Sequence, residues 1–354
     1  MQQRTEKEIM RNWKGDKGAP FVSICTITYN QEKYIAKTIE SFLMQETTFP
    51  FEIIIHDDAS IDSTREILLK YYDLYPKLIK LILQKENQYS QGKRVISFIF
   101  EKVKGKYLAL CEGDDYWTDP LKLQYQFSLM EEYPDCHISF HPAFELIEGV
   151  KSEKILSKYC DKNHVFDVST IISGGGGFCP TASLMINASV THNLPALFYN
   201  APVGDYFLQV FSSINGGALY LNKAMSIYRK GHKNSWSAGV KTVEKQLEAA
   251  YKFAESLEKL NKYTNKKYKR YIMHEMSRQF FFPSLQSFEE GRSKKLREIL
   301  FSYNIKYRRW DMINYLIIIC FFFKVRRHMQ IKLLKLFYFK ENNSSPRLVN
   351  KNDI

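Results

Sequence analysis

The sequence lacks the motifs of several common functional classes. Its six cysteines include no Cys-x-x-Cys pair, so neither a zinc ribbon nor a disulfide framework is indicated, and a reducing compartment is favoured. No Gly-x-Gly-x-x-Gly follows the first predicted strand, which excludes a dinucleotide-dependent dehydrogenase. The four glycines at 174–177 precede no Gly-Lys-Ser or Gly-Lys-Thr, so they are not a P-loop. They are compatible with a mobile lid at an acceptor site or with a merely flexible loop.

Long apolar segments are also missing. The first twenty residues are charged and contain no apolar core, so we expect no secretory signal peptide and a cytoplasmic location. The apolar run 315–323 would cover about half of a bilayer core as a helix. Because basic residues flank it, segment 305–340 suits an amphipathic helix lying on the inner face of an anionic membrane. It would equally suit a helix packed on the catalytic domain or on a second subunit of a homo-oligomer.

The composition is that of a globular protein with an excess of positive charge. The chain has 354 residues, of which 45% are hydrophobic, so it can bury a substantial core. Its formal net charge is +13, which calls for an anionic partner or surface. Nucleic acid, anionic lipid and a phosphorylated substrate all meet this requirement.

Predicted strands and helices alternate in the first third of the chain. Strands are predicted at 21–28, 51–55, 78–83 and 107–111, with helices between them, the third of which would end near Gly105, and a further helix at 121–133. Ser63 and Glu66 have the spacing of a capping box for the second of these helices. The alternation predicts an α/β fold with a mostly parallel, Rossmann-like sheet covered by helices.

The later part of the chain is less regular, and it suggests a division into domains. Residues 137–235 show only short strands, and after Trp236 the sequence is rich in Lys, Arg, Tyr and Phe at helical spacing. We expect an N-terminal extension at 1–19 and a catalytic domain at 20–235. Its nucleotide-binding half would be 20–120 and its acceptor half 121–235, followed by a basic, aromatic helical extension at 236–354.

Polar and acidic residues follow three of the predicted strands. Tyr29 and Asn30 end the first strand, Asp57 and Asp58 follow the second, and the segment 112–115, which reads Glu-Gly-Asp-Asp, follows the fourth. Ligands of open α/β sheets bind outside the carboxyl ends of the strands, so these carboxylates should meet at one edge. Crowded carboxylates favour a hard divalent cation such as Mg²⁺ or Mn²⁺, with a diphosphate completing its coordination. Each aspartate could instead be a turn or helix-cap residue.

These motifs resemble those of family 2 glycosyltransferases with the GT-A fold. The segments 22–30, 57–64 and 112–117 follow that family's order and approximate spacing, and the resemblance covers about residues 20–235. It implies transfer of a sugar from a nucleotide-sugar donor, a UDP-sugar being favoured, with inversion at the anomeric carbon. The acceptor would be a glycan or a lipid-linked sugar, as in polysaccharide biosynthesis, and nucleic acid would not be a partner.

The resemblance assigns roles to individual residues in the nucleotide-binding half. It puts the Ile27 backbone and Tyr29 beside the base, and Asp58 on the base edge or the ribose. Asp114 would hold the metal. Glu112 stands where the family usually has Asp, so it would contact either the metal or the ribose. Arg94, which follows Lys93 at the start of a predicted helix, is a weaker donor-binding candidate.

Two further assignments fall in the acceptor half. The segment 203–207 resembles the place of the family's catalytic base, and Asp205 is the matching carboxylate, although Asp205 could also be a helix N-cap. In the segment 228–232, His232 matches a position that closes over the diphosphate, which predicts a diphosphate or metal contact.

Two other functions remain to be weighed against a transferase. A sugar-phosphate nucleotidyltransferase needs a glycine-rich basic loop after the first strand, and the segment 28–32 lacks one. A non-enzymatic basic protein that binds membranes or nucleic acid would explain the net charge. It would leave the ordered carboxylates unexplained, because acidic clusters repel phosphate unless a metal intervenes.

Overall fold

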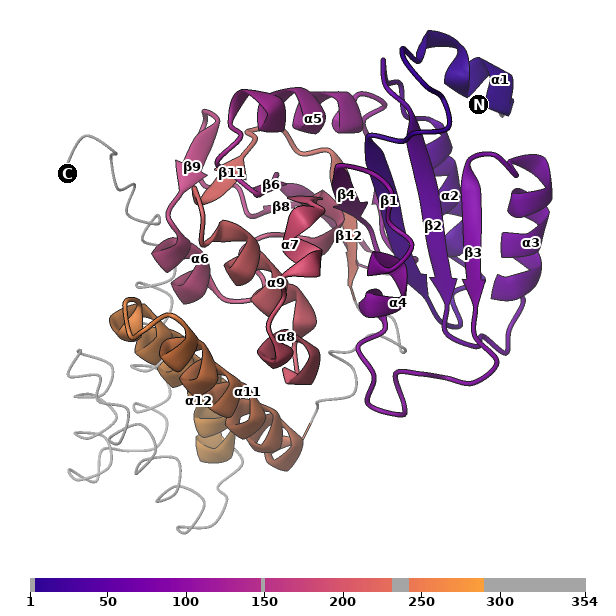
Figure 1. The fold of residues 1–354 in the computed structure, drawn as a ribbon. Helices are drawn as coiled ribbons and strands as arrows, with labels where there is room; N and C mark the ends of the chain where they lie inside the picture. Colours follow the sequence, from indigo (N-terminus) through magenta and orange to yellow (C-terminus); the bar gives the residue numbers. More distant parts are fainter. Residues whose placement is uncertain (1–3, 148–149, 231–241, 290–354) are drawn as a thin grey trace, which may run out of the picture. The chain divides into compact units, whose positions relative to one another are not determined.

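The computed structural model describes residues 4–147, 150–230 and 242–289 (Figure 1). The predicted contact His232 and the predicted membrane-surface segment 305–340 lie outside these residues. The chain forms two compact units, which are described separately. The first extends to Ser235 apart from two short segments; the second comprises those segments, 172–175 and 201–203, and the chain from Trp236 onward.

The described part of the first unit is built on an eight-stranded sheet with the order β3-β2-β1-β4-β10-β6-β11-β9 (Figure 1). The first four strands in this order are parallel. In register, β1 and β2 pair from Val22 opposite Phe51 to Thr28 opposite Asp57, so both end at the same edge. The strands are β1 (Val22–Thr28), β2 (Phe51–Asp57), β3 (Ile79–Leu83) and β4 (Tyr107–Leu110).

The other half of the sheet is mixed. Strand β10 runs antiparallel to both β4 and β6, and β11 is parallel to β6 but antiparallel to β9. These strands are β6 (Ile138–Phe140), β9 (His164–Phe166), β10 (Met185–Asn187) and β11 (Ala218–Tyr220). The predicted α/β class is confirmed, with the antiparallel pairs confined to this half. A second sheet has the order β5-β12-β7-β8 and contains β5 (Tyr116–Trp117), β7 (Ala143–Ile147), β8 (Val150–Leu156) and β12 (Ser226–Lys230).

Helices cover both faces of the parallel half. Alternate residues of β1 and β2, such as Ile24 and Ile53, share one buried cluster with residues of α2 (Ile35–Leu43), α3 (Thr64–Leu74) and α5 (Lys122–Glu132). On the other face, α4 (Ile96–Phe100) contacts β2, and the Phe98 ring stacks on His56 with their centroids 5.5 Å apart. Further helices are α6 (Val168–Gly174), α7 (Ser189–His192), α8 (Ala196–Asn200) and α9 (Gly204–Ser213).

The chain before β1 packs on the same core. It forms α1 (Glu6–Ile9) and a 3₁₀ turn at Met10–Asn12. Ile9 and Trp13 are buried within the cluster that contains β1 and β2. The Trp13 Nε1–H donates to the Thr47 hydroxyl at 3.0 Å, so the indole is both packed and hydrogen-bonded.

Two local predictions need correction. Helix α3 begins at Thr64, but Ser63 caps nothing with its side chain; Asp62 Oδ1 instead accepts from the Thr64 N–H at 3.0 Å. The predicted capping box is therefore wrong, because an aspartate one residue earlier satisfies the free amide. Helix α4 ends at Phe100, although its pattern predicted a helix reaching Gly105.

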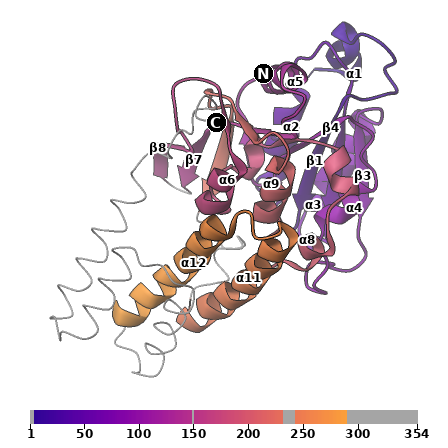
Figure 2. The same ribbon diagram turned by 60° about the vertical axis from the view of Figure 1, so that its left-hand side comes forward.

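The described part of the second unit contains two long helices, α11 (Val243–Tyr263) and α12 (Lys269–Glu289), which lie side by side (Figures 1 and 2). Gly175 belongs to this unit and has a φ of +70°, and a Cβ added there would lie 1.5 Å from Arg278 Nη2. This glycine is thus needed for close contact with an arginine that also pairs with the buried Glu275. No described helix combines the length and the apolarity that crossing a membrane requires.

Candidate active site

The loops that follow β1 and β2 hold each other in place. The Asn30 N–H donates to the Ser60 hydroxyl at 2.9 Å, and the Ile61 N–H donates back to Asn30 Oδ1 at 2.8 Å. One residue further on, the Gln31 N–H donates to Thr64 Oγ1 at 2.8 Å. Asn30 has a φ of +52°, a conformation that asparagine tolerates better than most residues. The carboxyl edge of the sheet is therefore framed by two loops of fixed mutual geometry.

The two adjacent aspartates at the end of β2 have different partners. Asp57 is fully buried and pairs with Arg65, whose Nη2 lies 2.6 Å from its carboxylate. Asp58 accepts from the backbone N–H groups of Gln88 at 2.8 Å and Tyr89 at 3.0 Å. Both carboxylates therefore stabilise local structure. Asp58 is predicted to contact the base or ribose, and in the structure its carboxylate anchors the loop after β3 at the carboxyl edge of the sheet.

The segment 112–115, here called the acidic turn, is seated against β1 and α2. The Gly113 N–H donates to the Ile27 carbonyl at 3.0 Å, and the Thr38 hydroxyl lies 2.9 Å from the Gly113 carbonyl and 2.6 Å from that of Asp115. A Cβ on Gly113 would lie 2.3 Å from Gln31 Oε1 and 2.9 Å from Thr28 Cβ. A larger residue at position 113 would therefore clash with the side chains of Gln31 and Thr28, which explains the glycine.

Arg229 on β12 holds the acidic turn from the other side. Its Nε–H donates to the Asp114 carbonyl at 3.0 Å, and its backbone N–H donates to Asp115 Oδ1 at 2.8 Å. The guanidinium lies over the Tyr34 ring, 4.5 Å from its centroid. Sequence reasoning passed over this residue in favour of His232. Its only signal was its place in the basic segment 228–232.

Three carboxylates of the acidic turn could hold a metal ion. Ligand atoms of Glu112, Asp114 and Asp115 all lie within 4.8 Å of one another. Asp115 Oδ2 is buried and has no hydrogen-bond partner among the residues that the structure describes, which is costly unless a cation contacts it. The sequence had singled out Glu112 and Asp114, and the structure adds Asp115. This donor set of carboxylate oxygens fits Mg²⁺ or Mn²⁺.

The pKa values of these carboxyls show that their negative charges crowd one another. The Glu112 side chain reaches solvent but is surrounded by protein on its other sides. This partial removal from water is the largest cause that raises the pKa of Glu112 to about 8, and the charges of Asp114 and Asp205 follow. Burial, then the charges of Asp114 and Glu112, also raises the pKa of Asp115. Placing a divalent cation here would reverse these shifts, because it would favour the charged carboxylates.

Asp205 is in the first turn of α9 and lies near the acidic turn, close enough for its charge to raise the pKa of Glu112. Burial raises the pKa of Asp205 itself, while the neighbouring Arg94 opposes that shift. Arg94 packs over the Phe198 ring, with its guanidinium carbon 5.5 Å from the centroid, and against Gly204. The structure therefore brings Asp205, Arg94 and Glu112 together from three separate segments.

The remaining predicted donor contacts lie along the edge of β1. Tyr29 is 40% exposed, which leaves a ring face available for stacking. The Ile27 carbonyl accepts from the Gly113 N–H at 3.0 Å, which occupies one of its two lone pairs. Tyr228, which sequence reasoning did not single out, faces the same site: burial, then the charges of Asp115 and Glu112, raises the pKa of its phenol.

The glycine run is better anchored than a mobile lid would be. Gln209 Nε2–H donates to the Gly176 carbonyl at 3.2 Å, and the Ser157 hydroxyl donates to that of Gly177 at 3.3 Å. Two elements distant in sequence thus hold the run. The tight contact of Gly175 with Arg278, described above, gives a packing reason for glycine at that position.

The architecture described above matches that of a solved glycosyltransferase structure. The structure superposes on that of Staphylococcus aureus TarS residues 1–349, solved in complex with UDP-GlcNAc, with a TM-score of 0.63 over 90% of this chain and 92% of that one. Sequence identity is 16%, so the likeness shows the fold, which is GT-A.

Sequence comparison identifies the family. Residues 23–185 match the model of glycosyl transferase family 2, and this region is a family 2 glycosyltransferase domain. The matched residues contain β1, β2, β4 and the acidic turn, so the family and the site described above coincide.

Two relatives illustrate how far the similarity extends. The uncharacterized protein Rv1520 of Mycobacterium tuberculosis is 36% identical over 219 residues, which cover 61% of this chain and 60% of that protein. The putative teichuronic acid biosynthesis glycosyltransferase TuaG of Bacillus subtilis is 36% identical over 132 residues, 37% of this chain and 48% of that protein. The chain thus spans 60% of the length of Rv1520 and 48% of the length of TuaG.

Proposed function

We propose that the protein transfers a sugar from a nucleoside-diphosphate sugar to a hydroxyl of a glycan or lipid-linked acceptor, with a divalent cation and inversion at the anomeric carbon. The observation that carries this proposal is the acidic turn at the carboxyl edge, where three carboxylates gather beside Asp205 within a family 2 domain. The same fold could serve other transferases, and the three gathered carboxylates favour one that uses a divalent cation.

Glu112, Asp114 and Asp115 would hold Mg²⁺ or Mn²⁺. When bound, the ion supplies Lewis acidity that stabilises the negative charge developing on the departing diphosphate. Arg229 and Thr38 keep the turn in position, so its carboxylates need no rearrangement when the donor arrives. His232, outside the described residues, is proposed as a further diphosphate or metal contact.

Asp205 is proposed as the general base. A sugar hydroxyl is a weak nucleophile near neutral pH, and a carboxylate can take its proton as the new bond to the anomeric carbon forms. Burial raises the pKa of Asp205, which makes its carboxylate a stronger base. Because attack on the anomeric carbon and departure of the diphosphate occur on opposite faces, a single displacement inverts the configuration.

The nucleotide is proposed to bind in the half formed by residues 20–120, and the acceptor in 121–235. Tyr29 would stack on the base beside Ile27, Asp58 would fix the loop that borders the ribose or base, and Glu112 would share the metal or the ribose. Arg94 is proposed to position Asp205 and to contact the donor, since it lies beside that carboxylate.

Names of similar proteins support a more specific assignment. TarS was solved with UDP-GlcNAc, and the relatives TuaG and GgaA of Bacillus subtilis are named for teichuronic and minor teichoic acid biosynthesis. We therefore favour a UDP-sugar as donor and a role in polysaccharide biosynthesis. A cytoplasmic enzyme at the inner face of the membrane would meet a lipid-linked acceptor, and segment 305–340 is the proposed contact.

The proposal is tested first by nucleotide binding. We expect UDP to raise the melting temperature only when Mn²⁺ or Mg²⁺ is present, because the diphosphate would otherwise meet uncompensated carboxylates. At a UDP concentration about 100 times its Kd, the stabilisation is about 2.7 kcal/mol. Replacing Asp114→Asn should abolish the shift, as measured by differential scanning fluorimetry over a UDP titration.

The base is tested separately. Asp205→Asn should retain the UDP-Mn²⁺ shift but lose transfer by about a hundredfold or more, since only proton removal is affected. Transfer is measured by release of UDP from a panel of UDP-sugars with acceptor present. An Asp205→Asn protein with full activity would remove this residue from the role of base.

The same assays separate the two other functions. A nucleotidyltransferase would form a nucleotide sugar from a nucleoside triphosphate and a sugar 1-phosphate with release of pyrophosphate. A non-enzymatic binding protein would bind vesicles or nucleic acid without a metal-dependent response to UDP. Either result without transfer would contradict the proposed activity.

A further inference from the structure

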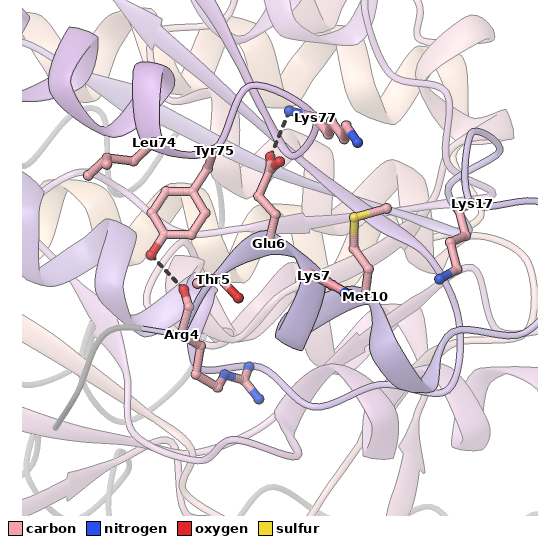
Figure 3. A pocket seen from close by; sticks show the side chains of 9 residues that line it. All are labelled: Arg4, Thr5, Glu6, Lys7, Met10, Lys17, Leu74, Tyr75 and Lys77. Atoms are coloured by element: carbon pink, nitrogen blue, oxygen red, sulfur yellow. Dashed lines mark hydrogen bonds between the residues drawn. The ribbon is translucent and has the colours of Figure 1, made fainter.

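A recess lies at the end of the sheet opposite the acidic turn. Figure 3 shows its lining side chains, which come from the segment around α1, from Lys17 before β1, and from the C-terminal end of α3 with Lys77 just after it. Its volume is about 660 Å³, within the range of sites that bind small molecules. Lys77 lies two residues before the start of β3, so the recess is at the amino-terminal edge of the strands. Strands of seven residues separate the two edges by about 20 Å.

The walls of the recess are held by hydrogen bonds between segments far apart in sequence. The Tyr75 hydroxyl donates to the Arg4 carbonyl at 2.7 Å, and Arg4 Nη2–H donates to the Leu43 carbonyl at 2.8 Å. Glu6 Oε1 accepts from the Lys77 N–H at 2.7 Å, as Figure 3 shows. Since the buried Ile9 anchors α1, the recess exists before any ligand binds.

Positive charge dominates the lining. Four basic residues stand against one carboxylate, Glu6, which is turned onto the backbone amides of Lys77 and Leu78. Arg4 is partly engaged, since it lies 3.8 Å from Glu46. Lys7, Lys17 and Lys77 are exposed, and within the described residues none of them forms an ion pair. The recess is therefore lined by three ammonium groups that form no ion pair with a carboxylate of the described residues.

The lining also has an apolar side. Met10, the exposed Leu74 and the ring of Tyr75 contribute carbon surface next to the lysines. A ligand that matches both sides carries concentrated negative charge joined to a carbon segment. Phosphate fits the charged part better than a single carboxylate, because it offers three acceptor oxygens and close to two charges to separate ammonium groups.

We propose that this recess binds a phosphate ester, with the phosphate among Lys7, Lys17 and Lys77 and the carbon segment against Met10 and Leu74. The ester is a monoester, either of a soluble phosphorylated molecule or of a phospholipid such as phosphatidic acid, and both present the same terminal phosphate. This site is separate from the acidic turn, and the proposal holds whether or not the protein transfers sugars.

The test compares two triple variants of the whole chain in EDTA, so that no metal holds a phosphate at the acidic turn. One is Lys7→Gln, Lys17→Gln and Lys77→Gln; its control, Lys70→Gln, Lys102→Gln and Lys104→Gln, removes the same charge from exposed lysines outside the recess. The probes are inorganic tripolyphosphate, measured by calorimetry, and vesicles of phosphatidic acid or phosphatidylcholine, measured by sedimentation. All proteins should unfold at the same temperature without a probe, since these lysines are exposed.

We expect the recess variant to bind an anionic probe at least about tenfold more weakly than the wild type, and the control variant to bind nearly as well as the wild type. Loss of binding to phosphatidic acid vesicles, alone or together with loss of tripolyphosphate binding, identifies a lipid head group. Loss of tripolyphosphate binding with unchanged vesicle binding identifies a soluble phosphate. Equal weakening in both variants, or no binding of either anionic probe by the wild type, overturns the proposal.

Discussion

Single residues of the acidic turn are constrained from several directions at once. Gly113 is enclosed by the side chains of Gln31 and Thr28, and the carbonyls on either side of Asp114 lie near the Thr38 hydroxyl. The sequence predicted that Glu112 and Asp114 lie together, because charged residues after a buried strand are visible in the pattern. Thr38 and Arg229 were not visible, since their importance arises from contacts between residues 75 or more positions apart.

Replacing Gly113→Ala should destabilise the protein and weaken nucleotide binding. The added methyl would lie 2.3 Å from Gln31 Oε1 and 2.9 Å from Thr28 Cβ, and such overpacking costs about 1–3 kcal/mol. Urea denaturation measures the free energy of unfolding. Gly177→Ala is the matched control, because a Cβ there meets nothing within 4 Å. Equal stability of the two variants would contradict the crowding described here.

Replacing Arg229→Lys should weaken metal binding by about tenfold, the low end of effects seen for residues that orient metal ligands. Lysine keeps the charge but lacks the Nε–H that donates to the Asp114 carbonyl, while the backbone bond to Asp115 remains. Mn²⁺ titration by calorimetry in the presence of UDP measures the change. Lys230→Arg, on the adjacent residue, is the control and should retain wild-type affinity.

At the scale of helices and strands, the parallel half of the sheet was predictable and the mixed half was not. The four parallel strands are apolar runs that alternate with helical patterns, and each was placed within a few residues. Strands β6, β10 and β11 have three residues each, too few to show a period. The insertion of β10 between β4 and β6 is a pairing of distant segments, which no local pattern reveals.

Helix α5 begins with a fully buried lysine, Lys122. Its Nζ lies 3.9 Å from the centroid of the Trp117 ring, is fully buried, and has no hydrogen-bond partner within the described residues. Burial lowers the pKa of Lys122 to about 7. A protonated lysine is therefore disfavoured in the folded protein relative to the unfolded chain, where its pKa is about 10.4.

This difference gives stability a specific pH dependence. Between about pH 7 and pH 10 the unfolded chain binds the proton that folded Lys122 has lost, so the contribution of Lys122 to stability rises with pH and is lost as pH falls to about 7. Lys122→Met should remove this dependence and stabilise the protein most near pH 6. Unfolding free energies at pH 6, 8 and 9.5 test it, with the exposed Lys102→Met as control; parallel pH profiles for wild type and Lys122→Met would contradict it.

The whole molecule combines a net charge of +13 with an acidic turn at one edge of its sheet. A positive surface would raise the local concentration of the proposed anionic donor, and the proposed metal ion would compensate the carboxylates that this donor must approach. Sequence reasoning recovered this electrostatic pattern and the family, because both depend on residue types and their order. It did not find the recess near α1, which is formed by segments that meet only in the folded chain.

The paired loops after β1 and β2 restrict how this edge can evolve. Hydrogen bonds join Asn30 to Ser60 and Ile61, Gln31 to Thr64, and Glu32 to Ser63. Each loop donates backbone N–H groups to side-chain oxygens of the other. A substitution in one loop removes the partner of an amide in the other, so the two cannot drift independently. A change of donor preference at this edge would therefore require coordinated substitutions in both loops, residues 29–34 and 58–64, and these would have to be inherited together.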